Sequence, residues 1–171
     1  IVPALFLTIS IYLLQIYRLK LSGIFLMFAI SAKLSMVVVL PIFMIYFLNN
    51  LSLRPLLWKF IFGLLFGFAI LGVPFLLSPS AYAMLFSNPE LSKIFNLSLV
   101  ISETSRIYLL PLVYLIFVSY CWFIGRLNLE LFKACCGIVL ILIVLMTPAS
   151  MGWFIWSLPF LVFYVAASGR L

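Results

Sequence analysis

Long apolar runs separated by short polar segments make up most of the chain. A helix needs roughly 20 apolar residues to cross the bilayer core of about 30 Å, so each run predicts a full or partial membrane helix. The pattern therefore predicts an all-α, polytopic transmembrane bundle of about seven short or full traverses. The expected helices lie in Ile1–Tyr17, in the two halves of Leu21–Leu48, and in Leu56–Leu77, Ile107–Ile124, Ala134–Met146 and Trp153–Ala167.

The run from Leu21 to Leu48 is interrupted by Lys33 and Pro41. These breaks favour two helices of about 12 and 14 residues that turn near residues 32–35, each reaching about 20 Å and forming a partial or re-entrant pair. A single long tilted helix is the alternative. In the following run, Gly63, Gly67 and Gly72 form a stripe of small residues that favours close packing against another helix.

The basic residues predict the sidedness of the bundle. Four clusters separate the apolar runs, and the positive-inside rule places them in the cytoplasm. The extracytoplasmic side would then receive the Lys33 turn, the mixed segment Ser78–Arg106 and the TPASMG turn at 147–152. The four cytoplasmic clusters are Arg18 with Lys20, Arg54 with Lys59, Arg126 with Lys133, and Arg170.

Composition excludes several kinds of chemistry. The 171 residues are 68% apolar and 8% charged, with a net charge of +7 and no histidine, so there is no room for a soluble catalytic domain. Aspartate is absent too, and the three cysteines lie in apolar runs, which removes the usual zinc sites and catalytic triads. No cofactor motif is evident, and a divalent metal is left open. The chain opens in mid-run at Ile1, which favours a single membrane domain, 1–171, that lacks its N-terminal part.

Two cations are candidates for binding a phosphate. Lys33 lies within an apolar run, where a charge costs about 2.5 to 3.5 kcal/mol on the insertion scale, so we expect it to meet an anionic head group such as the phosphate of a lipid carrier. A snorkelling lysine at a helix end is the alternative. Arg106 could hold a phosphate through two hydrogen bonds, or it could be an ordinary interfacial anchor at a helix start.

The carboxylates and tryptophans admit two interpretations each. Glu103 is a weak candidate for the catalytic base, and pairing with Arg106 across one helical turn is favoured. Glu90 fits the first turn of a short helix in ELSKIFNLSL. Trp153 and Trp156 either form an interfacial aromatic belt or stack against the face of a sugar.

Three segments in order resemble a known family: residues 23–48 (GIFLMFAISAKLSMVVVLPIFMIYFL), residues 67–86 (GFAILGVPFLLSPSAYAMLF) and residues 145–164 (LMTPASMGWFIWSLPFLVFY). Together they are similar to the middle and C-terminal half of GT-C polytopic glycosyltransferases. The closest similarity is to enzymes that use polyprenyl- or dolichyl-phosphate sugars, including the mannosyltransferases of lipid-linked oligosaccharide assembly and their bacterial polysaccharide relatives.

The resemblance implies a transferase that moves mannose or a similar hexose from a polyprenyl-phosphate donor to an acceptor on the extracytoplasmic side, in polysaccharide or glycolipid assembly. Its partners would be the lipid-phosphate sugar, a glycan or lipid-linked acceptor and membrane lipids, without nucleic acid. The family's catalytic carboxylate lies in a long outer loop that no segment here matches, so it is expected outside this chain.

A multi-pass transporter or flippase of a lipid-linked or small polar substrate is the alternative function, because broken helices also mark substrate pathways. The expected location is the bacterial inner membrane, with the endoplasmic reticulum membrane as the alternative.

Overall fold

The computed structural model describes residues 1–81, 93–103, 105–147 and 151–168, and these are mostly helical. The all-α prediction is therefore confirmed. The α-helices are α1 (Val2–Gln15), α2 (Leu19–Ala32), α3 (Leu40–Asn49), α4 (Leu57–Gly67), α5 (Val73–Leu76), α8 (Leu109–Phe123), α9 (Leu129–Met146) and α10 (Leu158–Ser168). Shorter elements are η1 (Leu34–Val39), η2 (Arg54–Leu56), the π-helical η3 (Phe68–Gly72), η4 (Lys93–Phe95), η5 (Met151–Trp156) and the strands β1 (Ser98–Val100) and β2 (Arg106–Tyr108).

Two helices in the described part of the chain are long and apolar enough to cross a membrane. One is the continuous stretch Arg54–Leu76 of 23 residues, and the other is α9 with 18. The remaining apolar helices, such as α1 and α8, are shorter. The structure thus supports an apolar helical bundle with two candidate spans, and a bundle of seven spans is not confirmed.

The break at Lys33 separates two helices, as predicted. Helix α2 ends at Ala32, Lys33 adopts an extended conformation with φ −156° and ψ 116°, and η1 leads into α3. Pro41 lies at the start of α3, where its missing N–H is not needed by the helix. The alternative of one long tilted helix is wrong, because the α-helical hydrogen bonding stops at Lys33.

Helices α1 and α2 form an antiparallel pair around a buried polar link. The Ser10 hydroxyl donates to the Ser22 carbonyl at 2.8 Å, and the Ser22 hydroxyl donates to the Ser10 carbonyl at the same distance. Both serines are fully buried. This reciprocal pair satisfies each hydroxyl inside the apolar bundle, where an unpaired one would be costly.

Glycines bring α2 and α4 into close contact, as the stripe of small residues predicted. A Cβ placed on Gly63 would collide with the backbone of Lys20, and one on Gly67 would lie 2.9 Å from the Cβ of Met27. Gly23 on α2 faces the Phe60 carbonyl in the same way. The predicted role of Gly72 is wrong, because its nearest neighbour is Phe68 of the same helix.

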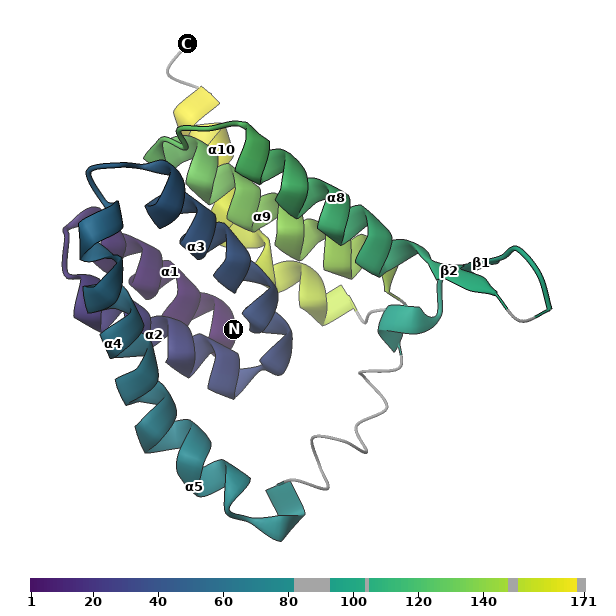
Figure 1. Cartoon of the computed structure of the whole chain (residues 1–171), viewed down its shortest axis with the longest axis horizontal. Coiled ribbons are helices and arrows are strands. Elements are labelled where there is room, and N and C mark those ends of the chain that lie inside the picture. The colour runs from purple at the N-terminus through teal and green to yellow at the C-terminus, as the bar shows by residue number, and fades with distance from the viewer. Residues whose placement is uncertain (82–92, 104, 148–150, 169–171) are drawn as a thin grey trace.

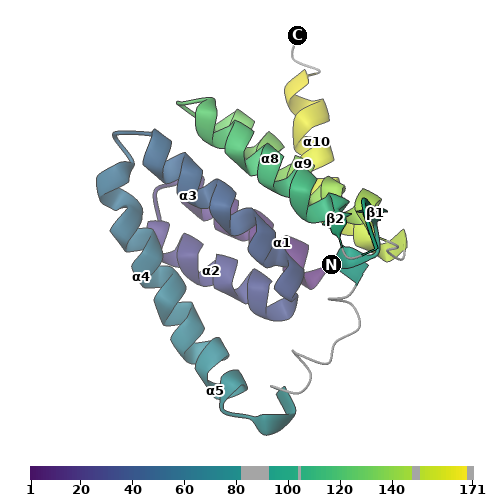
Figure 2. The ribbon, with the colours of Figure 1, turned by 45° about the vertical axis from the view of Figure 1, so that its right-hand side comes forward.

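A cluster of aromatic rings joins α3, α4 and α9. The Phe43 ring stacks on Phe60 with centroids 5.5 Å apart and meets Phe132 edge-on at 4.9 Å. Phe47 lies 5.1 Å from Phe60, and all four rings are fully buried. Figures 1 and 2 both show α1 to α3 lying between the arm made of α4 and α5 and the group made of α8, α9 and α10.

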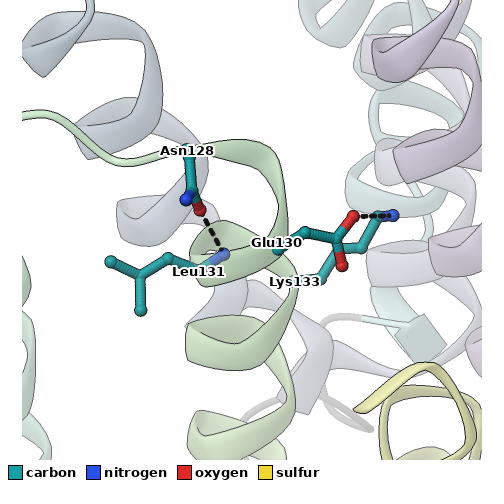
Figure 3. A network of polar contacts seen from close by, with 4 residues as sticks. All are labelled: Asn128, Glu130, Leu131 and Lys133. Atoms are coloured by element: carbon teal, nitrogen blue, oxygen red, sulfur yellow. Dashed lines mark hydrogen bonds and ion pairs between the residues drawn. The ribbon is translucent and has the colours of Figure 1, made fainter. Parts of the chain in front are cut away.

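Two predicted boundaries are wrong for local reasons. Helix α9 begins at Leu129 and not at Ala134, because the Asn128 side chain caps it by accepting a hydrogen bond from the Leu131 N–H at 2.7 Å (Figure 3). Within the described residues, the helix expected in ELSKIFNLSL is only the short η4. It does not continue, because Ser98 and Leu99 pair with Tyr108 and Ile107 in the β1–β2 hairpin. Glu90 lies outside the described residues.

Candidate functional site at the Lys33 break

Lys33 lies against two tryptophans that are 120 and 123 positions further along the chain. Its Nζ is 3.8 Å from the centroid of the Trp153 ring and 4.4 Å from that of Trp156. The two indoles lie close to each other, with centroids 4.8 Å apart and planes 31° apart. The structure therefore unites three of the residues that the sequence singled out, and it places the lysine at cation–π distance from both rings.

The local structure of η5 explains why both tryptophans face Lys33. A 3₁₀-helix has three residues per turn, so side chains at positions 153 and 156 project from the same face. Trp156 is buried and Trp153 is half-buried. The helix ends at Trp156, and the hydroxyl of the following Ser157 donates to the Phe154 carbonyl at 2.8 Å. One indole thus packs into the bundle while the other is partly exposed.

A second lysine approaches the same indole. Lys93 Nζ lies 6.0 Å from the Trp153 centroid, at the first residue of η4. Lys93 belongs to the mixed segment Ser78–Arg106, which was expected on the same side as the Lys33 turn. The contact with Trp153 places η4 at the Lys33 end of the bundle. The predicted topology places Lys93 on the outer side with Lys33 and Arg106, but Lys93 was not predicted to bind phosphate, because a lysine in a polar segment is ordinary until its neighbours are known.

The linkers with the basic clusters gather at the opposite end of the bundle, which we call the linker end. The Asn49 amide donates to the Trp122 carbonyl at 3.0 Å, and the Asn50 amide donates to the Leu127 carbonyl at 2.9 Å. A cavity of about 130 Å³ is lined by residues of all three linker regions, including Gln15, Leu53 and Leu129. Figure 1 shows the connections from α3 to α4 and from α8 to α9 at one end of the bundle, away from the α2–α3 connection.

Arg106 and Glu103 lie elsewhere. Arg106 pairs with Val100 in the β1–β2 hairpin, which projects from the bundle (Figure 1), and its side chain is exposed. Glu103 is in the turn of that hairpin. The favoured pairing of the two across a helical turn is wrong, because this segment is a hairpin, and no ion pair joins their described side chains.

Glu130, the other carboxylate among the described residues, lies at the linker end. Glu130 and Lys133 form an ion pair of 3.1 Å in the first turns of α9 (Figure 3). No cluster of three metal-ligating side chains occurs among the residues that the structure describes. Cys121 and Cys135 lie 3.5 Å apart through their sulfur atoms, buried between α8 and α9, as expected for small apolar residues.

An apolar groove of about 580 Å³ runs between α3 and α8. The helices are parallel here, since the Tyr114 hydroxyl donates to the Val38 carbonyl at 3.0 Å while Asn49 reaches Trp122. The groove is lined by Met44 on one side and Val118 on the other, together with their neighbours. Its walls suit a hydrocarbon chain.

Comparison with protein-family models, with curated proteins and with solved structures finds no match to this chain.

Proposed function

We propose that this chain is the membrane portion of a GT-C-type glycosyltransferase, which moves mannose or a similar hexose from a polyprenyl-phosphate donor to an acceptor on the extracytoplasmic side. One observation carries the proposal. The ammonium of Lys33, at a helix break in an apolar stretch, lies on the faces of Trp153 and Trp156. A lipid-phosphate sugar presents the two groups that such an arrangement recognises, an anion and a sugar ring.

The chemistry of the three side chains matches the two parts of that substrate. A lysine ammonium has three N–H donors, and phosphate oxygens are the acceptors with which such donors form charge-assisted hydrogen bonds. The half-buried Trp153 has a partly open surface on which the apolar face of a sugar could stack. The groove between α3 and α8 would hold the hydrocarbon tail.

The sidedness of the charges supports the same proposal. The clusters of Arg18, Arg54 and Arg126 belong to the linker end, and Lys33 and Lys93 belong to the other. If the linkers are cytoplasmic, as the positive-inside rule predicts, the head group of the donor is bound on the outer side. The catalytic carboxylate remains expected outside this chain.

The test is transfer from a labelled polyprenyl-phosphate mannose in membranes that contain the full-length protein. Lys33→Ala should reduce transfer by about tenfold or more, because a charge-assisted hydrogen bond contributes about 1.5 to 3 kcal/mol. Lys20→Ala is the matched control, because Lys20 also lies on a ring face, 5.4 Å from the Phe62 centroid. It lies at the start of α2, at the linker end. We expect it to change transfer less than twofold.

Lys33→Arg separates a binding role from a structural one. Arginine keeps the charge and the contact with the indoles, so it should restore part of the transfer lost in Lys33→Ala. Equal transfer by Lys33→Ala and the unmodified protein would refute the proposed head-group site.

A further inference from the structure

We infer that Lys93 is a second cation of the Lys33 site and that the pair selects a phosphate monoester, the dianionic product of transfer, over the monoanionic phosphodiester of the donor. This inference rests on the proposed function. It assigns a role in the leaving-group step to a residue that no motif in the sequence had marked.

The geometry comes from one indole that both lysines approach. Lys33 Nζ lies 3.8 Å and Lys93 Nζ lies 6.0 Å from the centroid of Trp153. Both distances start at the same centroid, so the two ammonium groups are at most about 10 Å apart. Two charge-assisted hydrogen bonds of about 2.8 Å would take up more than half of that span. Movement of the lysine side chains by a few ångströms would therefore let both ammonium groups donate to one phosphate group.

The two lysines differ in how firmly the rings hold them. Lys33 contacts both indoles, one of them buried, at a break between two helices. Lys93 meets only Trp153 among these rings, near the outer limit of about 6 Å for a cation–π contact. We assign Lys33 to the charge already present on the donor phosphate, and Lys93 to the charge that appears during transfer.

The charge appears at a defined atom. In the transfer, the bond between the anomeric carbon and the phosphate oxygen breaks, and its electron pair stays on that oxygen. The acceptor hydroxyl oxygen forms the new bond to the anomeric carbon, and its proton passes to a carboxylate base. The phosphodiester carries one negative charge, and the monoester that leaves carries nearly two at pH 7, since its second pKa is about 6. A second cation beside the phosphate therefore favours the transition state over the bound donor.

A binding experiment tests this without requiring turnover. The chain has four tryptophans. In the full-length protein, Trp58→Phe and Trp122→Phe, together with replacement of every tryptophan outside this chain, leave Trp153 and Trp156 as the fluorescent reporters. Vesicles of neutral lipid are titrated with polyprenyl phosphate or with its methyl phosphodiester, and the change in emission gives the affinity for each. In this background the monoester should bind about tenfold more tightly than the diester, the contribution of one additional charged hydrogen bond.

Lys93→Gln should abolish this preference and leave diester binding within about twofold, whereas Lys33→Gln should weaken both lipids about tenfold. Lys93→Arg should keep the preference, because it keeps the charge. Lys59→Gln, an exposed lysine on α4, is the matched control and should alter neither affinity. In the transfer assay, Lys93→Gln should lower kcat and leave KM nearly unchanged.

The outcomes separate the two proposals. An unchanged ratio of the two affinities in Lys93→Gln, with binding that still depends on Lys33, overturns the role of Lys93 alone. Failure of the unmodified protein to bind either lipid overturns the proposed function together with this inference.

Discussion

The two ends of the helical bundle hold their cations in different ways. At the linker end, Arg54 donates to the Leu48 carbonyl at 2.7 Å, Lys133 pairs with Glu130, and Arg126 is exposed. At the other end, Lys33 lies on two indoles, one of them buried. Lys20 and Lys133 at the linker end each lie over a single phenylalanine ring, 5.4 Å from its centroid. A lysine that lies on two indoles from a distant segment requires specific tertiary structure. This requirement distinguishes the Lys33 end as the candidate site.

The largest expected effect is that the two ends of the bundle face opposite compartments. Ser31 and Ser52 are exposed residues at the Lys33 end and the linker end. In a protein with Cys121, Cys135 and Cys136 replaced by alanine, Ser31→Cys should react with a membrane-impermeant maleimide from the extracytoplasmic side only. Ser52→Cys should react from the cytoplasmic side only.

Labelling of both cysteines from the same side would show that the bundle does not separate two compartments. The proposed outer donor site would then have no basis. Labelling of a Ser80→Cys variant from the same side as Ser31→Cys would extend the assignment to the start of the mixed segment.

The next largest effect concerns the packing that holds the bundle together. Gly63→Ala should destabilise the protein by about 2 kcal/mol, because its Cβ would collide with the Lys20 backbone and force α2 and α4 apart. This cost exceeds the gain of about 1 kcal/mol from replacing glycine in a helix. Unfolding in detergent micelles, followed by circular dichroism, measures the difference.

Gly72→Ala is the matched control for this prediction. Its Cβ would meet only the side chain of Phe68, which is exposed and can rotate away. We expect Gly72→Ala to be neutral or slightly stabilising. Equal destabilisation by both variants would contradict the glycine-mediated contact between α2 and α4.

The smallest predicted effect tests the structure of the linker end. Asn128→Ala should lower the free energy of unfolding by about 1 kcal/mol through loss of the α9 cap. Glu130→Gln removes an exposed ion pair and should cost less than about 0.5 kcal/mol. Neither variant should change binding at Lys33. A larger loss from Glu130→Gln than from Asn128→Ala would show that charge, and not capping, fixes the start of α9.

Some of the fold followed from local patterns, and some did not. Helix α8 begins and ends within two residues of its predicted run, because an uninterrupted apolar segment leaves the backbone no polar alternative to the helix. The break at Lys33 was predicted because a charged residue interrupts the apolar run there. The hairpin of β1 and β2 was missed, since a three-residue strand carries too short a pattern to separate from a loop.

The long apolar helices, the break at Lys33 and the positions of the basic linkers could be predicted from the amino-acid sequence. These features depend on residues close together in the chain, through hydropathy, backbone hydrogen bonding and charge. The meeting of Lys33, Lys93 and Trp153, and the separate hairpin that holds Arg106 and Glu103, follow from the packing of the whole chain. Such contacts depend on which helix faces pack together, through the shapes of glycines and aromatic rings distributed over the whole chain, and no local pattern specifies that pairing.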